Sequence, residues 1–376
     1  MFYYLYFWLH NQFHIFNLFR YITFRTAAAS LTALFLSLVL GPWLIRKLKE
    51  FQVGQYIREE GPQSHQSKAG TPTMGGVLIV LCIIVPTLLW ADLGNPFVWL
   101  VTAVTVAFAA IGFWDDFQKL RHRNNLGLRA RTKFFLQILV SFLFAVTLVL
   151  MTAQGLYSTA LTFPFFKNFR PELTIGFLRT HAWTYPLAFL PFLVFVVFLL
   201  VGSSNAVNLT DGLDGLAIGC VLITAGALTV LTYVAGHAVL AGYLDIEHLP
   251  RAAELTIFCG AMFGSGLGFL WYNAYPAEIF MGDVGSLALG GAISTVAVVI
   301  KQELLLPFIG GVFMVEALSV ILQVASYRMR GKRIFKMAPI HHHFELTGWK
   351  ESKIIARFWI VALIFALFAL TTLKLR

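Results

Sequence analysis

The sequence predicts an all-α polytopic membrane protein with about ten transmembrane helices, and three observations support this fold class. First, 58% of the 376 residues are hydrophobic and only 12% are charged, whereas a soluble globular protein carries roughly 25% charged residues. Second, the hydrophobic residues form ten runs, most of them close to the roughly 20 residues that a helix needs to cross a bilayer. Third, each run is continuously apolar instead of alternating, which favours helices over a barrel.

The chain is expected to form one membrane domain, residues 1–376, without an internal repeat. Its predicted spans cover residues 22–45, 74–91, 97–114, 134–153, 185–204, 214–235, 253–272, 285–300, 304–327 and 354–373. Residues 1–21 lack the cationic start of a signal peptide and are rich in aromatic side chains, so we expect them to lie at the outer membrane interface. The three cysteines fall within spans and are interpreted as small apolar residues without a disulfide framework.

The distribution of basic residues predicts the orientation of these spans. Ten spans place both termini on one side, and the connections on the opposite side, from Arg46 to Arg357, hold 19 of the 28 Lys and Arg. The positive-inside rule makes these connections cytoplasmic and both termini periplasmic. The only long periplasmic connection is then 154–184, where we expect a short hairpin or an interfacial helix, and the longest cytoplasmic one is 328–353. The net charge of +10 indicates anionic lipid and an anionic substrate as partners, not nucleic acid.

Three acidic motifs fall at the cytoplasmic ends of predicted spans. Asp115 and Asp116 end the third span, and Asp283 precedes the eighth between two glycines. Simpler interpretations exist: the pair could be a solvated helix end neutralised by Lys119, and Asp283 could be a helix N-cap. The third motif, NLTDGLDG, repeats a polar side chain every third position and predicts a polar face, although Asp211 alone could cap a helix. The polar residues of this motif are Asn208, Asp211 and Asp214.

The loop that follows the ninth span contains three consecutive histidines, His341, His342 and His343, among several bases. Neighbouring residues on a helix point about 100° apart, so these histidines are not expected to converge on one zinc ion. We interpret them as donors that face phosphate oxygens. Glu316 lies within a span, where an ionisable group is a functional candidate, but it could equally bind a neighbouring helix.

Together, these residues predict a site for phosphoryl transfer at the membrane surface. Carboxylates without thiolates favour Mg²⁺, which proteins bind through one or two carboxylates together with substrate phosphates. Lys and His donors, glycine-rich backbone and the aromatic ring of Phe280 would complete the site. One substrate is then expected to be membrane-bound and the other soluble. A transporter of an anionic solute is the alternative, but it predicts polar groups near the midplane of the membrane.

The motifs WDD, NAVNLTDGLDG, FMGDVGSLALGG and APIHHHFE occur in this order, and the chain resembles the phospho-N-acetylmuramoyl-pentapeptide-transferases from about Thr23 to its C-terminus. The acidic motifs are shared with the wider family of polyprenyl-phosphate sugar-1-phosphate transferases. GTPTMGG and PIHHHFE are typical of the muramoyl-pentapeptide branch. A related polyprenyl-phosphate GlcNAc-1-phosphate transferase remains an alternative.

The resemblance implies a ten-helix, usually homodimeric protein of the bacterial inner membrane that requires Mg²⁺. It implies transfer of phospho-MurNAc-pentapeptide from UDP-MurNAc-pentapeptide to undecaprenyl phosphate, which gives lipid I and UMP. It also implies that Asp115, Asp116 and Asp283 are the catalytic carboxylates and the metal ligands, with Asp283 the best ligand. The residues implied to line the substrate site are Lys68, Thr73, Lys119, Lys133, Asn208, Asp211, Asp214, Asn273, Phe280, Gln323, His341, His342 and His343.

Overall fold

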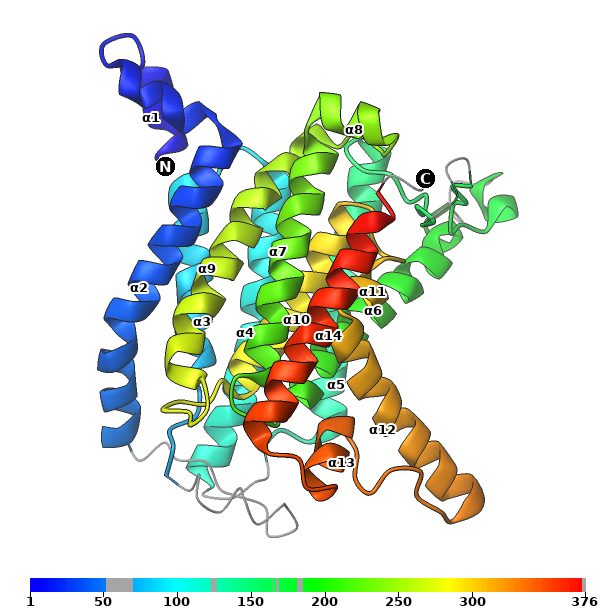
Figure 1. The fold of residues 1–376 in the computed structure, drawn as a ribbon. Coiled ribbons are helices and arrows are strands. Elements are labelled where there is room, and N and C mark those ends of the chain that lie inside the picture. The colour runs from blue at the N-terminus through cyan, green and yellow to red at the C-terminus, as the bar shows by residue number, and fades with distance from the viewer. Residues whose placement is uncertain (52–69, 123–126, 165, 167–168, 181–184, 374–376) are drawn as a thin grey trace.

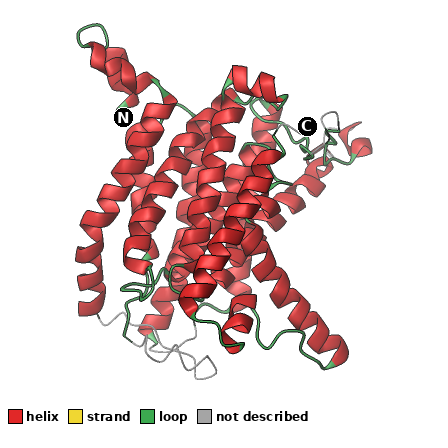
Figure 2. Cartoon of the chain, viewed as in Figure 1, coloured by secondary structure: helices red, strands yellow, loops and turns green. Residues whose placement is uncertain are grey.

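The computed structural model describes residues 1–51, 70–122, 127–164, 166, 169–180 and 185–373, and these residues are almost entirely helical (Figure 2). Within these described residues, nine helices are long and apolar enough to cross a membrane. They are α2 (Ile22–Glu50), α4 (Pro96–Arg121), α5 (Ala130–Ala153), α6 (Leu190–Thr210), α7 (Leu216–Gly236), α9 (Leu255–Asn273), α10 (Gly282–Val299), α12 (Gly311–Arg330) and α14 (Glu351–Thr371). The remaining predicted span, 74–91, corresponds to the shorter apolar helix α3 (Gly76–Trp90). The predicted all-α polytopic fold is therefore confirmed.

Helix α10 forms the centre of the bundle, and it packs against α4, α6 and α3 (Figure 1). Every residue from Val284 to Val299 is buried. The sequence of this segment explains its position, because small residues such as those of GSLALGGA let neighbouring helix backbones approach closely in a membrane. Helix α9 lies in the adjacent layer and packs against α2, α7 and α3. Helix α12 tilts away from the bundle and is largely exposed along its length (Figure 1).

The connections contain short helical elements. These are α1 (Tyr3–Leu9), η1 (His14–Arg20), η3 (Gly176–Thr180), η4 (Tyr185–Phe189), α8 (Ala238–Leu244), η5 (Pro250–Glu254), α11 (Leu306–Ile309) and α13 (Ile340–Leu346). In the 154–184 connection, an isolated antiparallel bridge joins Ala160 to Glu172 and the short 3-10 helix η3 follows. The hairpin or interfacial helix expected for this connection stays a prediction. The three cysteines are buried and unpaired, as expected.

The two ends of the described chain lie at the same end of the bundle, as an even number of spans requires (Figure 1). We call this the terminal end. Its periplasmic orientation remains a prediction. The N-terminal segment rests on the bundle here, because the α-amino group of Met1 donates to the carbonyls of Leu88 and Leu89 and the ring of Phe19 stacks on Trp90 with centroids 5.7 Å apart.

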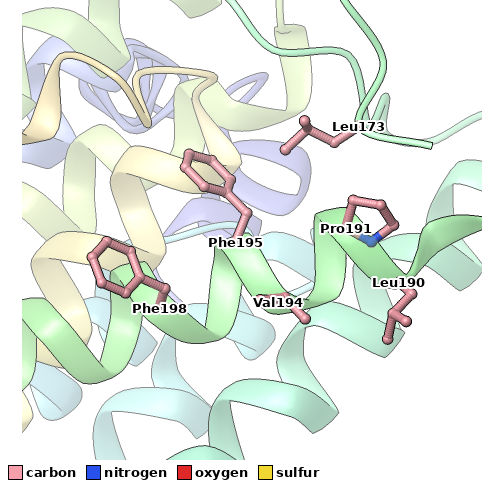
Figure 3. Close-up of a pocket in the computed structure, with 6 residues that line it drawn as sticks. All are labelled: Leu173, Leu190, Pro191, Val194, Phe195 and Phe198. Atoms are coloured by element: carbon pink, nitrogen blue, oxygen red, sulfur yellow. The ribbon is translucent and has the colours of Figure 1, made fainter. Parts of the chain in front are cut away.

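An apolar groove runs along the half of α6 near the terminal end (Figure 3). Pro191 and Phe195 lie on the side of α6 toward Leu173, which belongs to the 154–184 connection. Its lining residues are Leu173, Leu190, Pro191, Val194, Phe195 and Phe198. It contains no titratable group and lies at the opposite end of α6 from Asn208, so the chemistry must be sought elsewhere.

Candidate active site at the acidic end of the bundle

Three carboxylates from two helices meet at the end of the bundle opposite the termini, which we call the acidic end. Asp115 and Asp116 lie near the last turn of α4, and Asp283 lies in the first turn of α10. One carboxylate oxygen from each residue lies within 4.8 Å of the others. The predicted association of Asp283 with the Asp115–Asp116 pair is therefore present in the structure.

Glycine at position 282 allows the two helices to approach. Gly282 has a φ of +70°, and a Cβ atom there would lie 2.5 Å from Asp116 Oδ2 and 3.0 Å from Thr73 Oγ1. A larger residue would thus meet both backbone strain and a steric clash. The backbone N–H groups of Gly75 and Gly76 donate to the carbonyls of Phe280 and Met281 at 2.8 Å. These bonds hold the described part of the GTPTMGG motif beside the FMGD motif.

Two lysines neutralise part of the carboxylate charge. Lys119 Nζ lies 2.6 Å from Asp115 Oδ2, 3.1 Å from Asp116 Oδ1 and 3.0 Å from Asp283 Oδ2. Lys133 Nζ lies 2.6 Å from Asp283 Oδ2. Three carboxylates face two ammonium groups, so the ionised cluster carries one uncompensated negative charge. All three candidate ligands offer oxygen, which is the donor set that a hard divalent cation prefers.

The simpler interpretations of these acids do not describe what is observed. Lys119 does pair with Asp115 and Asp116, but both carboxylates are buried instead of solvated. Asp283 does not cap α10, because the N-cap position is Met281. Its side chain is 15% exposed, whereas those of Asp115 and Asp116 are 5% and 4% exposed. The cluster is therefore reached from outside through Asp283 and the two lysines.

The NLTDGLDG motif joins α6 to α7 beside this cluster, and its three polar residues have different partners. Asn208 Oδ1 accepts a hydrogen bond from Ser286 Oγ at 3.0 Å, and Asp214 Oδ2 accepts one from the Ala277 N–H at 3.0 Å. Asp211 ends α6 and does not cap α7, whose N-cap is Gly215. Burial raises the pKa of the Asp211 carboxyl to about 8, and the charges of Asp283, Asp116 and Asp214 act in the same direction.

Two amides that the sequence assigns to the substrate site bind backbone groups in the structure. Asn273 accepts from the Gly215 N–H and donates to the Ile279 carbonyl. Gln323 accepts from the N–H groups of Ile334 and Phe335 and donates to the carbonyl of Phe335. Both residues therefore fix the loops around the site. Thr73 and Phe280 are half-buried near the carboxylates, and Lys68 lies outside the described residues.

The three histidines bind three different partners instead of converging. His341 Nδ1 lies 3.1 Å from Glu316 Oε1, and both side chains are fully buried. His342 Nδ1 lies 2.7 Å from Glu345 Oε2, and His343 Nδ1 accepts from the Lys336 N–H at 3.1 Å. The Nε2 edge of His341 faces Gly212, where no Cβ could be accommodated. The buried Glu316 thus orients the histidine that lies closest to the NLTDGLDG motif.

Two partners of the site were missed by the sequence analysis. Ser286 binds Asn208, and Glu351 Oε1 accepts a hydrogen bond from the Asp214 N–H at 3.1 Å. Glu351 could have been noticed as an acidic residue at the start of the last span. Ser286 carries no such signal, because a serine that follows GDVG in an apolar run is equally compatible with helix packing.

The fold and this site define the class of protein, a polytopic membrane transferase. The sequence profile of glycosyl transferase family 4 matches residues 98–301, a range that includes all three carboxylates. A second match, to phospho-N-acetylmuramoyl-pentapeptide-transferase signature 1 (MraY), covers residues 68–80 and contains the GTPTMGG motif.

Curated relatives narrow the class to one family. The chain is 69% identical to the phospho-N-acetylmuramoyl-pentapeptide-transferase of Koribacter versatilis, over 98% of this chain and 97% of the relative. It is 66% identical to the protein of that name from Acidobacterium capsulatum, over 98% of each chain. The corresponding protein of Solibacter usitatus is 62% identical, over 99% of this chain and all of the relative. The chain belongs to the phospho-N-acetylmuramoyl-pentapeptide-transferase family and is an integral bacterial membrane protein.

Proposed function

We propose that this chain transfers phospho-MurNAc-pentapeptide from UDP-MurNAc-pentapeptide to undecaprenyl phosphate, and that the products are lipid I and UMP. The observation that carries the proposal is the cluster of three carboxylates and two lysines at one end of a helical bundle. Such a position suits a reaction between a soluble nucleotide and a lipid phosphate. The positive-inside rule supports placing this end at the cytoplasmic face of the inner membrane.

Magnesium suits this cluster. Asp283, the most exposed of the three acids, would be its principal ligand, with Asp115 and Asp116 beside it. The uncompensated negative charge and the purely oxygen donor set support this assignment. When bound, the ion would offset the negative charge of the diphosphate and of the departing UMP. Lys119 and Lys133 would add positive charge on the same side of Asp283.

The proposed reaction is an in-line displacement in which Asp115 deprotonates or orients the lipid phosphate. A phosphate oxygen of undecaprenyl phosphate forms a bond to the phosphorus that carries the sugar. The bond from this phosphorus to the bridging oxygen breaks, and its electron pair leaves with UMP. The Leu128 N–H donates to Asp115 Oδ1 at 2.9 Å and holds this carboxylate in place.

A two-step route is the rival, in which a carboxylate attacks the nucleotide sugar and forms a phosphorylated enzyme before the lipid reacts. The two routes differ in what happens without the lipid acceptor. The single displacement predicts no UMP release from UDP-MurNAc-pentapeptide alone. A stoichiometric burst of UMP, or a phosphorylated Asp detected by mass spectrometry, would establish the two-step route.

The substrate assignment is tested with protein purified and reconstituted with undecaprenyl phosphate. We expect a lipid-linked product and UMP from UDP-MurNAc-pentapeptide, but not from UDP-GlcNAc. Removal of divalent cations by a chelator should abolish the reaction, and added Mg²⁺ should restore it. Product from UDP-GlcNAc alone would identify the related GlcNAc-1-phosphate transferase activity. Uptake of the nucleotide into vesicles without UMP release would instead favour a transporter.

A homodimer is also proposed, on the resemblance alone. The mass of the detergent-solubilised protein, measured by light scattering with the detergent contribution subtracted, distinguishes a dimer from a monomer.

A further inference from the structure

Two amide side chains, one fully buried and one half-buried, connect α5 to α6 close to the acidic end. Asn205 Nδ2 of α6 donates to Gln137 Oε1 of α5 at 2.7 Å, and also to the carbonyl of Val201 at 2.8 Å. The Gln137 side chain is fully buried. The two helices are neighbours in the bundle, and α5 otherwise presents many exposed apolar side chains, such as Phe134 and Phe135.

Stability alone does not explain this pair. Gln137 Nε2 is buried and finds no hydrogen-bond partner among the residues that the structure describes. A buried polar atom without a partner is destabilising, while a hydrogen bond between membrane helices contributes little stability on average. An apolar pair of similar size would serve packing at least as well. The amides therefore require another explanation.

The pair lies directly next to the site along both helices. Gln137 follows Lys133 by four residues, so the two side chains lie on the same face of α5, one turn apart. Asn205 precedes Asn208 by three residues and shares a face of α6 with it in the same way. Lys133 binds Asp283, and Asn208 binds Ser286, which is also on α10.

These contacts connect the three helices α5, α6 and α10 to one another. Helix α6 is bound to α10 by the bonds from Ser286 to Asn208 and from Ser204 Oγ to the Leu287 carbonyl. The amide pair binds α5 to α6, and the Lys133–Asp283 contact at 2.6 Å binds α5 to α10, so that each of the three helices is bound to the other two. The rotation of α5 about its own axis sets the direction in which the Lys133 side chain leaves the helix, and so decides whether its ammonium group reaches Asp283.

We propose that Gln137 and Asn205 are positioning residues that fix this rotation and thereby hold Lys133 against Asp283. Apolar contacts with lipid and with neighbouring helices have little directional preference, whereas the amide–amide hydrogen bond specifies one rotation of α5. Asp283 thus receives its second ammonium group from a helix whose orientation is set one turn deeper in the bundle. As a statement about catalysis, the inference rests on the proposed function.

A double-mutant cycle tests the proposal. Gln137→Leu should lower kcat by about tenfold, because a small displacement of a catalytic group is enough for such a loss. If Gln137 acts through Lys133, the same substitution should have no further effect in a Lys133→Ala background. The double exchange Gln137→Asn with Asn205→Gln, which keeps two amides in the pair, should recover most of the activity. Ser141→Ala is the matched control, because the hydroxyl of this buried α5 residue donates only within its own helix.

A second measurement reports the geometry without the reaction. In a Lys133→Cys, Asp283→Cys variant, a bifunctional thiol reagent about as long as a lysine side chain should join α5 to α10, because this contact spans too far for a direct disulfide. Gln137→Leu should slow that cross-link several-fold. If the cross-link responds but no transferase activity is found with the parent protein, the positioning role stands and the proposed function fails. Equal cross-linking with and without Gln137→Leu, or equal losses of kcat in both arms of the cycle, would overturn the proposal.

Discussion

The two ends of α10 carry buried lysine–carboxylate clusters that differ in charge balance and access. At the acidic end, three carboxylates share two lysines, and the Lys119 side chain is 32% exposed. At the terminal end, Lys301 pairs with Glu303 at 2.9 Å, and their side chains are 1% and 0% exposed. One cluster has excess negative charge and an open side, whereas the other is closed.

The closed cluster has every feature of a structural contact. Lys301 Nζ also donates to Tyr157 Oη at 3.2 Å and to the Ser158 carbonyl at 2.9 Å. Tyr157 Oη donates in turn to the Val298 carbonyl at 2.9 Å. Burial raises the pKa of the Glu303 carboxyl, and the Lys301 charge opposes this shift. The charges of Lys301 and Glu303 balance each other and neither side chain is open to solvent, and the pair connects the 154–184 segment to α10. Buried charge alone therefore does not identify an active site.

The largest expected effect comes from the open cluster. Asp283→Asn should lower the transferase rate by about a thousandfold, the upper range for removal of one charge-stabilising group from an active site. The melting temperature should fall only slightly, because Asp283 pairs with both lysines and the replacing amide can still accept hydrogen bonds from them. UMP release and thermal unfolding in detergent give the two readings. Asp92→Asn, at the terminal end, should remain active, and an Asp283→Asn enzyme with more than about a tenth of the parent rate would contradict the assignment.

The opposite pattern is expected at the closed cluster. Lys301→Met leaves Glu303 buried without its cation, which should cost about 3–5 kcal/mol of stability. The rate per folded molecule should be unchanged. Because the pKa of Glu303 is raised, its carboxyl becomes neutral as the pH falls, so the stability loss should shrink at low pH. Thermal unfolding across pH measures both effects. A variant that is stable but inactive would remove the distinction between the two ends.

A smaller effect is expected for Glu316, a buried acid near the acidic end. Glu316→Leu removes the partner of His341 Nδ1 and should lower kcat by about tenfold through misorientation of the ring. Glu316→Gln keeps an acceptor and should lose less. Steady-state kinetics of both variants, compared at equal folded fraction, measure this difference. Equal losses in the two variants would show that the charge of Glu316, not its orientation of His341, is required.

The smallest expected effect concerns pH. The Asp211 carboxyl, with a pKa near 8, is protonated at neutral pH and becomes ionised as the pH rises through 8. Because the same carboxyl in the unfolded chain ionises near 3.8, its contribution to stability is lost gradually as the pH rises from about 4 to about 8. We expect UDP affinity to fall several-fold between about pH 7 and 9, because a new negative charge then faces the nucleotide. Calorimetric titration measures this fall, which should be absent from Asp211→Asn.

Individual residues show which features of the structure could be predicted from the sequence. Long apolar runs predicted the helices, because the membrane leaves few other ways to satisfy backbone hydrogen bonds. The helix ends that carry Asp115, Asp116 and Asp283 were predicted to lie together, and they do. The assignment of Asn273 and Gln323 to the substrate site stays a prediction, and the structure adds that both amides bind backbone groups. An amide at the end of a span looks the same in the sequence whichever role it has.

The sequence by itself determined the all-α membrane fold, the predicted even number of spans and the family. The length of an apolar run and the presence of a local motif depend only on consecutive residues. Only the tertiary structure decided which side chains meet. The binding of Asp283 by Lys119 and Lys133, the burial of His341 against Glu316 and the pairing of Gln137 with Asn205 depend on the rotation of each helix about its axis. That rotation follows from the packing of the whole bundle, in which residues far apart in the chain become neighbours.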